Sequence, residues 1–199
     1  MKKPKITFNA PVVLGFAIAG LAVMILNLLT GGASNRLLFS TYRARPLSPL
    51  TWIRLFTHVL GHSGWDHYIG NMAYLLLLGP ALEEKYGSKR ILGVMAAAAL
   101  STGLLHTLLF PRSALCGASG VVFAFILLTS FTGFREGELP VTVILVALIY
   151  IGQQVYDGIF VKDNVSNLSH IVGGLVGAGA GYLMNRGRKT GGRRRRTSS

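Results

Sequence analysis

Charged side chains are scarce in this chain of 199 residues: 14% are Asp, Glu, Lys or Arg, where an ordinary soluble domain has about 25%. Hydrophobic residues make up 51% of the sequence. This composition disfavours a soluble globule and predicts an integral membrane protein.

Cysteine is almost absent as well, since Cys116 is the only one. A single cysteine excludes an intramolecular disulfide and the paired cysteines of a CxxC or Cys/His zinc site. We expect neither a metal nor another cofactor, and we interpret Cys116 as a small buried hydrophobe.

Acidic residues number only seven, and all of them lie at the ends of apolar segments or between these segments. The lack of carboxylates inside the apolar segments argues against an aspartyl intramembrane protease, which requires paired acids. It also argues against a proton-coupled transporter that relies on a buried acid. No internal repeat is apparent, so the inverted-repeat signature of many transporters is missing too.

Long intervals without any charge define six apolar segments, because a helix that spans a bilayer needs roughly 20 mostly apolar residues. We predict an all-α membrane protein with a transmembrane domain over residues 1–185. Its six spans are expected near residues 10–30, 66–83, 90–110, 117–134, 139–156 and 167–185. The second and fifth are near the lower length limit, so we expect them to run steeply or to thin the bilayer.

The first segment has a basic start followed by an apolar run, which also resembles a secretory signal peptide. The run from Ala10 to Leu29 is longer than the about 7–15 residues of a signal's apolar region. This length favours a retained helix, which we count as the first span.

The twenty Lys and Arg residues give a formal net charge of +13, which in a soluble protein would suggest a nucleic-acid partner. Here they flank apolar segments, so membrane topology explains them better and no nucleic acid is expected. Six spans place both termini on one side, which collects fourteen basic residues against six on the other. This asymmetry predicts a multi-pass protein of a cell membrane with cytoplasmic termini, and residues 186–199 as a basic, disordered cytoplasmic tail.

The segment between the first two spans, residues 31–65, is unusually rich in aromatic and apolar side chains, among them Trp52, Phe56 and Trp65. Such side chains favour the boundary between a bilayer and water. We therefore expect this loop to lie in the outer membrane interface.

Polar side chains inside the spans are few, and each is costly there unless it is satisfied or used. Ser119 opens the fourth span between small residues, which permit a close approach of substrate, and the first amides of a helix are unpaired. His170 begins a face of the sixth span that continues with Gly173, Gly174, Gly177 and Gly181. Such faces let transmembrane helices pack tightly, and contact with the fourth span would bring His170 within reach of Ser119.

Together, Ser119 and His170 fit nucleophilic catalysis, because a serine hydroxyl becomes nucleophilic when an imidazole takes its proton. With no acid inside the membrane, the pair would act as a dyad. His67 and Asn71 are four residues apart on one helical face, so they could donate to an oxyanion with the Ser119 amide. Each polar residue alone is more often an interhelical hydrogen-bonding group, and the glycine face alone is packing. Their combination is more specific.

These motifs resemble those of the rhomboid intramembrane serine proteases, over about residues 10–185. The matching groups are Arg54 with Phe56-Thr57-His58, His67-x-x-x-Asn71, Glu83 with Gly87-Ser88, Gly117-x-Ser119-Gly120, and Ser169-His170-x-x-Gly173-x-x-x-Gly177. The resemblance implies a six-transmembrane-helix bundle whose active site opens to the outer face through a water-filled cavity. It also implies a substrate that is a transmembrane segment of another membrane protein, cut near its outer end.

The resemblance further implies that Ser119 is the nucleophile and His170 the general base, while His67 and Asn71 donate to the oxyanion. Arg54 and Glu83 resemble structural positions of the family. Two positions depart from its pattern. Phe123 stands where members often have a tyrosine, and Ile53 precedes Arg54 where a tryptophan is usual.

Two other functions remain open at this point. The first is a catalytically silent rhomboid-like protein that binds membrane segments, against which the presence of both Ser119 and His170 weighs. The second is a small transporter component, which the lack of intramembrane charge disfavours.

Overall fold

Residues 8–133, 141–160 and 164–186 are described by the computed structural model of this chain. Over these ranges the chain forms helices and no strand, apart from an isolated antiparallel pairing of Thr41 with Leu115. The predicted all-α class is confirmed. Most of the predicted tail, residues 187–199, lies outside the described residues.

The helices of the described ranges follow one another in a simple order. They are α1 (Pro11–Leu29), α2 (Ala33–Leu37), α3 (Pro49–Thr57), η1 (His58–Leu60), α4 (Trp65–Tyr86), α5 (Ser88–Leu109), α6 (Ser119–Ser130), η2 (Phe131–Gly133), α7 (Val141–Phe160) and α8 (Asn164–Asn185).

A helix lies over each of the six predicted spans, but their lengths differ from the prediction. The α4 helix has 22 residues and α7 has 20, so neither is short. In α4 the charged residues Glu83, Glu84 and Lys85 extend the last turn beyond the apolar part. The short helix is instead α6, with 12 residues followed by the 3-10 turn η2.

By length and composition, two helices of the described ranges are able to cross a membrane: α1, with a mean hydropathy of 2.6, and α5, with 1.7. The α6 helix with η2 is a shorter apolar segment. The α4 helix mixes apolar residues with His67, Asn71 and its charged last turn, which lowers its hydropathy. The count of six spans stays a prediction.

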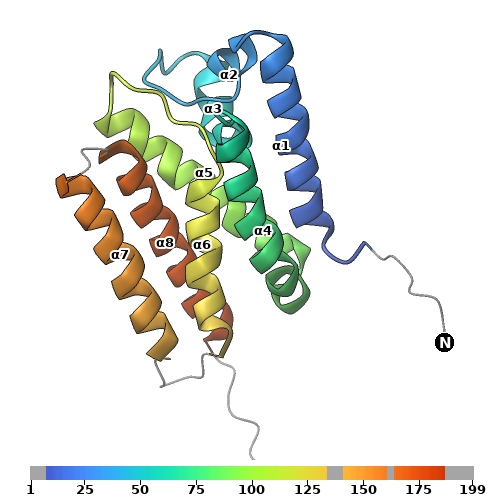
Figure 1. The fold of residues 1–199 in the computed structure, drawn as a ribbon, viewed down its shortest axis with the longest axis vertical. Coiled ribbons are helices and arrows are strands. Elements are labelled where there is room, and N and C mark those ends of the chain that lie inside the picture. The colour runs from blue at the N-terminus through green and yellow to red at the C-terminus, as the bar shows by residue number, and fades with distance from the viewer. Residues whose placement is uncertain (1–7, 134–140, 161–163, 187–199) are drawn as a thin grey trace, which may run out of the picture.

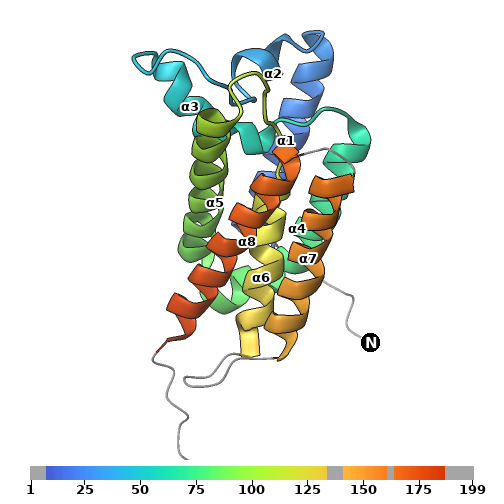
Figure 2. The same cartoon turned by 90° about the vertical axis from the view of Figure 1, so that its left-hand side faces the viewer.

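The α6 helix lies in the middle of the bundle, in contact with α4, α5, α7 and α8 (Figures 1 and 2). The α1 helix packs on α4 at one side. The two short helices α2 and α3 lie together at one end of the bundle. Helices α6 and α8 both start in the half of the bundle nearer that end. The first residues of α6 and α8 therefore lie in the half of the bundle that the loop 31–65 covers.

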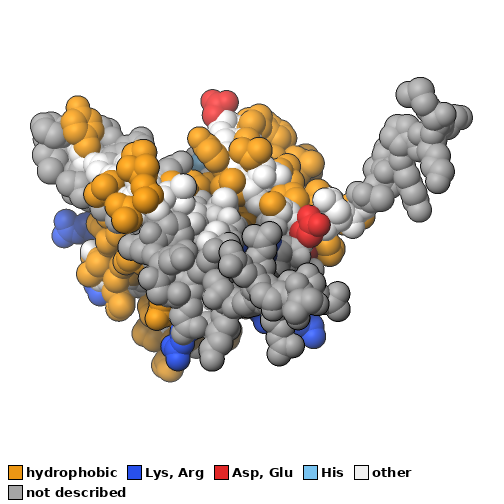
Figure 3. Space-filling view, turned by 90° about the horizontal axis from the view of Figure 1, so that it is seen from below, with side chains coloured by type: hydrophobic (Ala, Val, Ile, Leu, Met, Phe, Trp, Pro, Cys, Tyr) orange, Lys and Arg blue, Asp and Glu red, His pale blue; other side chains and the backbone are white. Residues whose placement is uncertain are grey.

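The core and the surface of the bundle are both apolar. Phe125, Leu75 and Leu128 are fully buried, while Leu77, Leu148 and Leu183 are 73%, 65% and 64% exposed on three different helices. Seen from the end opposite α2 and α3, hydrophobic side chains make up much of the described surface in view, and a few Lys and Arg side chains lie near its outline (Figure 3). Such extensive apolar exposure is costly in water and suits a bilayer.

A carboxylate caps the start of α1, whose first amides have no partner within the helix. Glu83 accepts hydrogen bonds from the backbone amides of Val12 and Val13, each at 3.0 Å, and from the Ser88 hydroxyl at 2.6 Å. Since Glu83 lies in the last turn of α4, this contact fixes the end of α4 against the beginning of α1.

Helices α6 and α8 approach so closely that only glycine fits between them. A Cβ atom on Gly173 would overlap the carbonyl oxygen of Gly120, and one on Gly177 would overlap that of Ala124. At Gly181 a Cβ atom would lie 2.7 Å from Phe131. The residue numbers of these contacts increase along α6 and α8 together, so the two helices run parallel. The start of α8 therefore lies beside the start of α6.

We expect Gly177→Ala to destabilise the folded protein by about 3 kcal/mol or more, the upper part of the range for overpacked cores, because the opposing atom is backbone. Gly179→Ala is the matched control, since a Cβ atom there meets nothing within 4 Å. Thermal unfolding in detergent measures both. Equal melting temperatures would contradict the packing described for α6 and α8.

Candidate active site

Ser119 is the first residue of α6 and is half-buried. The preceding loop is held at two points. Thr41 and Leu115 exchange two backbone hydrogen bonds of 2.9 Å, and the Gly117 amide donates to the His58 carbonyl at 2.9 Å. Because the first amides of a helix lack intrahelical acceptors, Ser119 sits where backbone donors are available to a bound group.

His170 approaches the same end of α6. Its ring stacks on Phe123 with the centroids 4.3 Å apart and the planes 4° from parallel. Phe123 is four residues after Ser119 and shares its helical face. His170 is also one turn before Gly173, whose partner across the interface is Gly120. The ring therefore lies beside the first turn of α6, and the phenylalanine retains the stacking role without a hydroxyl.

His67 and Asn71 lie on the other side of the residues that precede Ser119. A Cβ atom at Gly117 would be 2.6 Å from both Cε1 and Nε2 of His67, and 3.8 Å from Nδ2 of Asn71. Gly117 has φ +128°, a conformation that side chains other than glycine rarely adopt. Glycine here serves both the backbone turn and the close approach of the imidazole.

Asn71 is 7% exposed, and its amide nitrogen Nδ2 has no hydrogen-bond partner within the part of the chain that the structure describes. A buried donor without an acceptor costs about 1–3 kcal/mol of folding free energy. Together with its proximity to Gly117, this makes Nδ2 a donor that a bound oxygen would satisfy.

A hydrogen bond to Ser63 sets the protonation of the His67 ring. The backbone amide of Ser63 points at His67 Nδ1 at 3.5 Å, and the Ser63 hydroxyl is 3.0 Å from the same nitrogen. A backbone N–H can only donate, so Nδ1 is the acceptor and Nε2 carries the proton in the neutral ring. The donor Nε2–H is then the nitrogen beside Gly117.

Two other histidines, His58 and His62, are tied to backbone. His58 is 1% exposed, and its Nδ1 pairs with the Arg54 carbonyl at 3.1 Å. His62 is fully buried, with Nδ1 3.1 Å from the Leu60 carbonyl. Burial lowers the pKa of each to about 4, so both rings are neutral near pH 7. Their burial within the loop 31–65 and their bonds to its backbone indicate a structural role.

Arg54 anchors that loop. Its Nε donates to the Leu37 carbonyl at 2.7 Å, and its guanidinium lies 4.5 Å from the centre of the Tyr42 ring. The Trp52 ring nitrogen donates to the Pro46 carbonyl at 2.9 Å, while the tryptophan is 57% exposed. The loop is thus partly folded, with an apolar outer surface.

Cys116 lies three residues before Ser119 but is a poor rival for it. Burial raises the pKa of the Cys116 thiol, so the protonated, weakly nucleophilic form is favoured. Among the described residues, no group of three or more His, Cys, Asp and Glu side chains is placed to hold a metal ion.

The chain also matches a known protein family. The family profile described as Rhomboid domain matches residues 49–187, which extend from α3 through the end of α8. The chain belongs to the rhomboid family. The resemblance that the motifs indicate is thereby confirmed, and with it membership of a family of multi-pass membrane proteins.

Individual relatives of this rhomboid chain come from animals and bacteria. Rhomboid-related protein 2 of Mus musculus is 31% identical over 158 residues, which are 69% of this chain and 52% of that protein. Rhomboid protease GluP of Bacillus subtilis is 29% identical over 75% of this chain and 30% of its own length. Rhomboid protease GlpG of Salmonella paratyphi A is 28% identical over 65% and 48%. The chain spans about half of the first relative and less of the others.

Within this rhomboid domain, the structure brings three of the four predicted site residues to the start of α6: His170 through its stacking on Phe123, and His67 and Asn71 through their approach to Gly117. The fourth, Ser119, is the start itself. Sequence reasoning missed Ser63, which lies just before α4. Its only signal is the spacing of four residues to His67, which is informative once both are known to be near a helix start.

Proposed function

We propose that this rhomboid chain is an intramembrane serine endopeptidase. It hydrolyses a peptide bond in or near the transmembrane segment of another membrane protein, using a dyad of Ser119 and His170 and no metal or cofactor. The observation that carries this proposal is the convergence of three groups on one helix start. The nucleophile's helix begins there, an imidazole stacks against its first turn, and two side-chain donors face the residue Gly117.

The reaction follows from the roles of these groups. His170 takes the proton of the Ser119 hydroxyl as Oγ bonds to the substrate's carbonyl carbon, and the carbonyl oxygen becomes an oxyanion. His67 Nε2–H, Asn71 Nδ2–H and the backbone amide of Ser119 donate to that oxygen. The protonated His170 then gives its proton to the leaving amine, and water repeats the sequence to release the acyl group from Ser119.

Reconstitution tests the proposal. The purified chain is placed in vesicles with a panel of single-span membrane proteins, and cleavage is followed by the masses of the fragments. We expect a cut in or near the membrane segment of at least one substrate. A properly folded chain that binds such segments and cuts none would instead be a silent member of the family.

Cys116→Ser is expected to keep cleavage close to the unsubstituted level. The thiol is held protonated by burial, and its side-chain contact is with Ser40 on the covering loop. Loss of activity in a folded Cys116→Ser protein would make the cysteine the candidate nucleophile, so the cleavage rate per folded molecule is the measurement.

The predicted orientation has its own test. In the Cys116→Ser background, Leu47→Cys adds a thiol at a position that is 97% exposed in the loop 31–65, and Ser198→Cys adds one in the tail. An impermeant thiol reagent applied outside the cell is expected to label the first and not the second. The reverse pattern would put the Ser119 end on the cytoplasmic face.

A further inference from the structure

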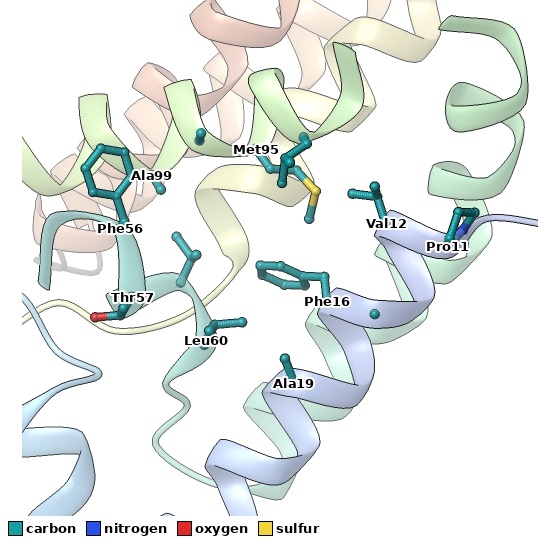
Figure 4. A pocket seen from close by; sticks show the side chains of 13 residues that line it. Pro11, Val12, Phe16, Ala19, Phe56, Thr57, Leu60, Met95 and Ala99 are labelled. Carbon is teal, nitrogen blue, oxygen red and sulfur yellow. The ribbon is translucent and has the colours of Figure 1, made fainter. Parts of the chain in front are cut away.

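A cavity of about 520 Å³ lies on the flank of the bundle, away from the residues proposed for catalysis. Its walls come from α1, from α3 with η1, and from α5 (Figure 4). Phe16, Met95 and Leu60 point into it from these three elements. The cavity is bounded by the two helices that are long and apolar enough to cross a membrane.

The lining is almost wholly apolar. Thr57 contributes the one hydroxyl among the lining side chains, and that hydroxyl donates to the backbone carbonyls of Leu38 and Ile53. The hydrogen of that hydroxyl is therefore already used, and the lining offers water no free side-chain donor. An empty void would leave its walls without dispersion contacts, so an apolar occupant is favoured.

The shape of the cavity selects among apolar occupants. Its lining on α5 runs from Leu92 to Ala99 and on α1 from Pro11 to Ala19, so it extends along the bundle axis for about 10 Å at 1.5 Å per residue. A partner helix is about 10 Å across, and the volume would admit little more than one turn of it. A segment of an extended hydrocarbon chain fits within both the length and the volume.

A cation lies at one end of the cavity. Lys89 is exposed in the first turn of α5, three residues before the lining residue Leu92, and such spacing puts both on neighbouring positions of one helical face. Arg90 is exposed as well, but it lies on the face of α5 opposite the residues that line the cavity. A phosphate held near Lys89 would leave its acyl chain aligned with the cavity.

We propose that this cavity is a binding site for an anionic diacyl phospholipid, with one acyl chain between α1 and α5 and the phosphate beside Lys89. The site goes beyond the proposed proteolysis and does not depend on it. It would tie α1, which precedes the matched rhomboid domain, to α3 and η1.

The test uses the full chain in bilayer nanodiscs that contain phosphatidylglycerol with a photoactivatable group in its acyl chain. Met95 and Val59 line the cavity but are only 3% and 5% exposed, so adducts on them report chains inside it and not lipid at the outer surface. We expect adducts at Met95 in the unsubstituted protein.

Gly15→Leu fills the cavity, because a Cβ atom there meets nothing within 4 Å and the position belongs to the lining. Gly93→Leu is the matched control on α5, equally free of contacts and outside the lining. We expect Met95 adducts to fall severalfold in the first and to persist in the second. Ala96→Leu, from the opposite wall, repeats the test if Gly15→Leu does not fold.

The headgroup is tested by competing phosphatidylglycerol with phosphatidylcholine of the same chains. Lys89→Glu is expected to remove a preference of about fivefold, the equivalent of about 1 kcal/mol per lysine at an anionic surface, and Arg90→Glu to leave it. Undiminished Met95 adducts in folded Gly15→Leu or Ala96→Leu would overturn the acyl site. An unchanged lipid preference in Lys89→Glu would overturn the phosphate contact. Neither readout depends on cleavage.

Discussion

Ser119→Ala and His170→Ala are each expected to abolish cleavage while leaving a folded membrane protein. The two residues act as a unit in the proposed chemistry, so losing either should cost nearly as much as losing both. Neither substitution adds volume to the interface between α6 and α8. The measurement is the cleavage rate of a reconstituted substrate, together with the melting temperature of each variant.

The matched control for the serine is Ser130→Ala, at the other end of α6. The Ser130 hydroxyl bonds to the Ile126 carbonyl at 3.3 Å, a local contact far along the helix from the first turn. We expect this variant to cut normally. Cleavage at the unsubstituted rate in purified Ser119→Ala would end the proposed mechanism.

His67→Ala and Asn71→Ala are expected to slow cleavage by about 10²–10³ each, the usual cost of one oxyanion donor, or roughly 2.7–4 kcal/mol. The reason is their shared approach to Gly117 at the start of α6, with Nε2–H of His67 and Nδ2 of Asn71 facing the same point. The backbone amide of Ser119 remains in both variants. Each should therefore retain more activity than Ser119→Ala.

A purely structural role for these two residues predicts a different outcome. If they only join helices, the variants melt early but turn over normally per folded molecule. Asn71 argues against that outcome in a specific way, because its Nδ2 makes no hydrogen bond in the described structure whose loss would destabilise the fold. Turnover per folded molecule, measured beside the melting temperature, separates the two roles.

Much of the fold followed from charge spacing. Intervals without charge located the helices well because a charge inside a bilayer is costly, so apolar runs and helices coincide. The same rule underestimated the length of α4, because the helix continues through Glu83 and its charged neighbours. Glu83 is accommodated there because it caps the amides at the start of α1. A carboxylate that serves another helix's amides is a tertiary contact, which the composition of its own helix does not reveal.

The site was predictable in its residue types but not in its supports. Ser119, His170, His67 and Asn71 are polar in apolar surroundings, which marks them in the sequence. Gly117 stands in the predicted Gly117-x-Ser119-Gly120 motif, but its backbone conformation and its contact with His67 could not be predicted, and Ser63 carries no mark at all. The first is needed for its φ of +128° and its lack of a side chain near His67, and the second for a bond to one ring nitrogen. Both depend on which segments meet in space.

The central claim, that Ser119 is an activated nucleophile, is tested most directly by the site of modification with a fluorophosphonate. We predict one covalent adduct in the folded chain, located by peptide mass on Ser119, lost in Ser119→Ala and greatly slowed in His170→Ala. Labelling of Cys116→Ser should be undiminished. An adduct on another residue, or equal labelling with and without the imidazole of His170, would contradict the account.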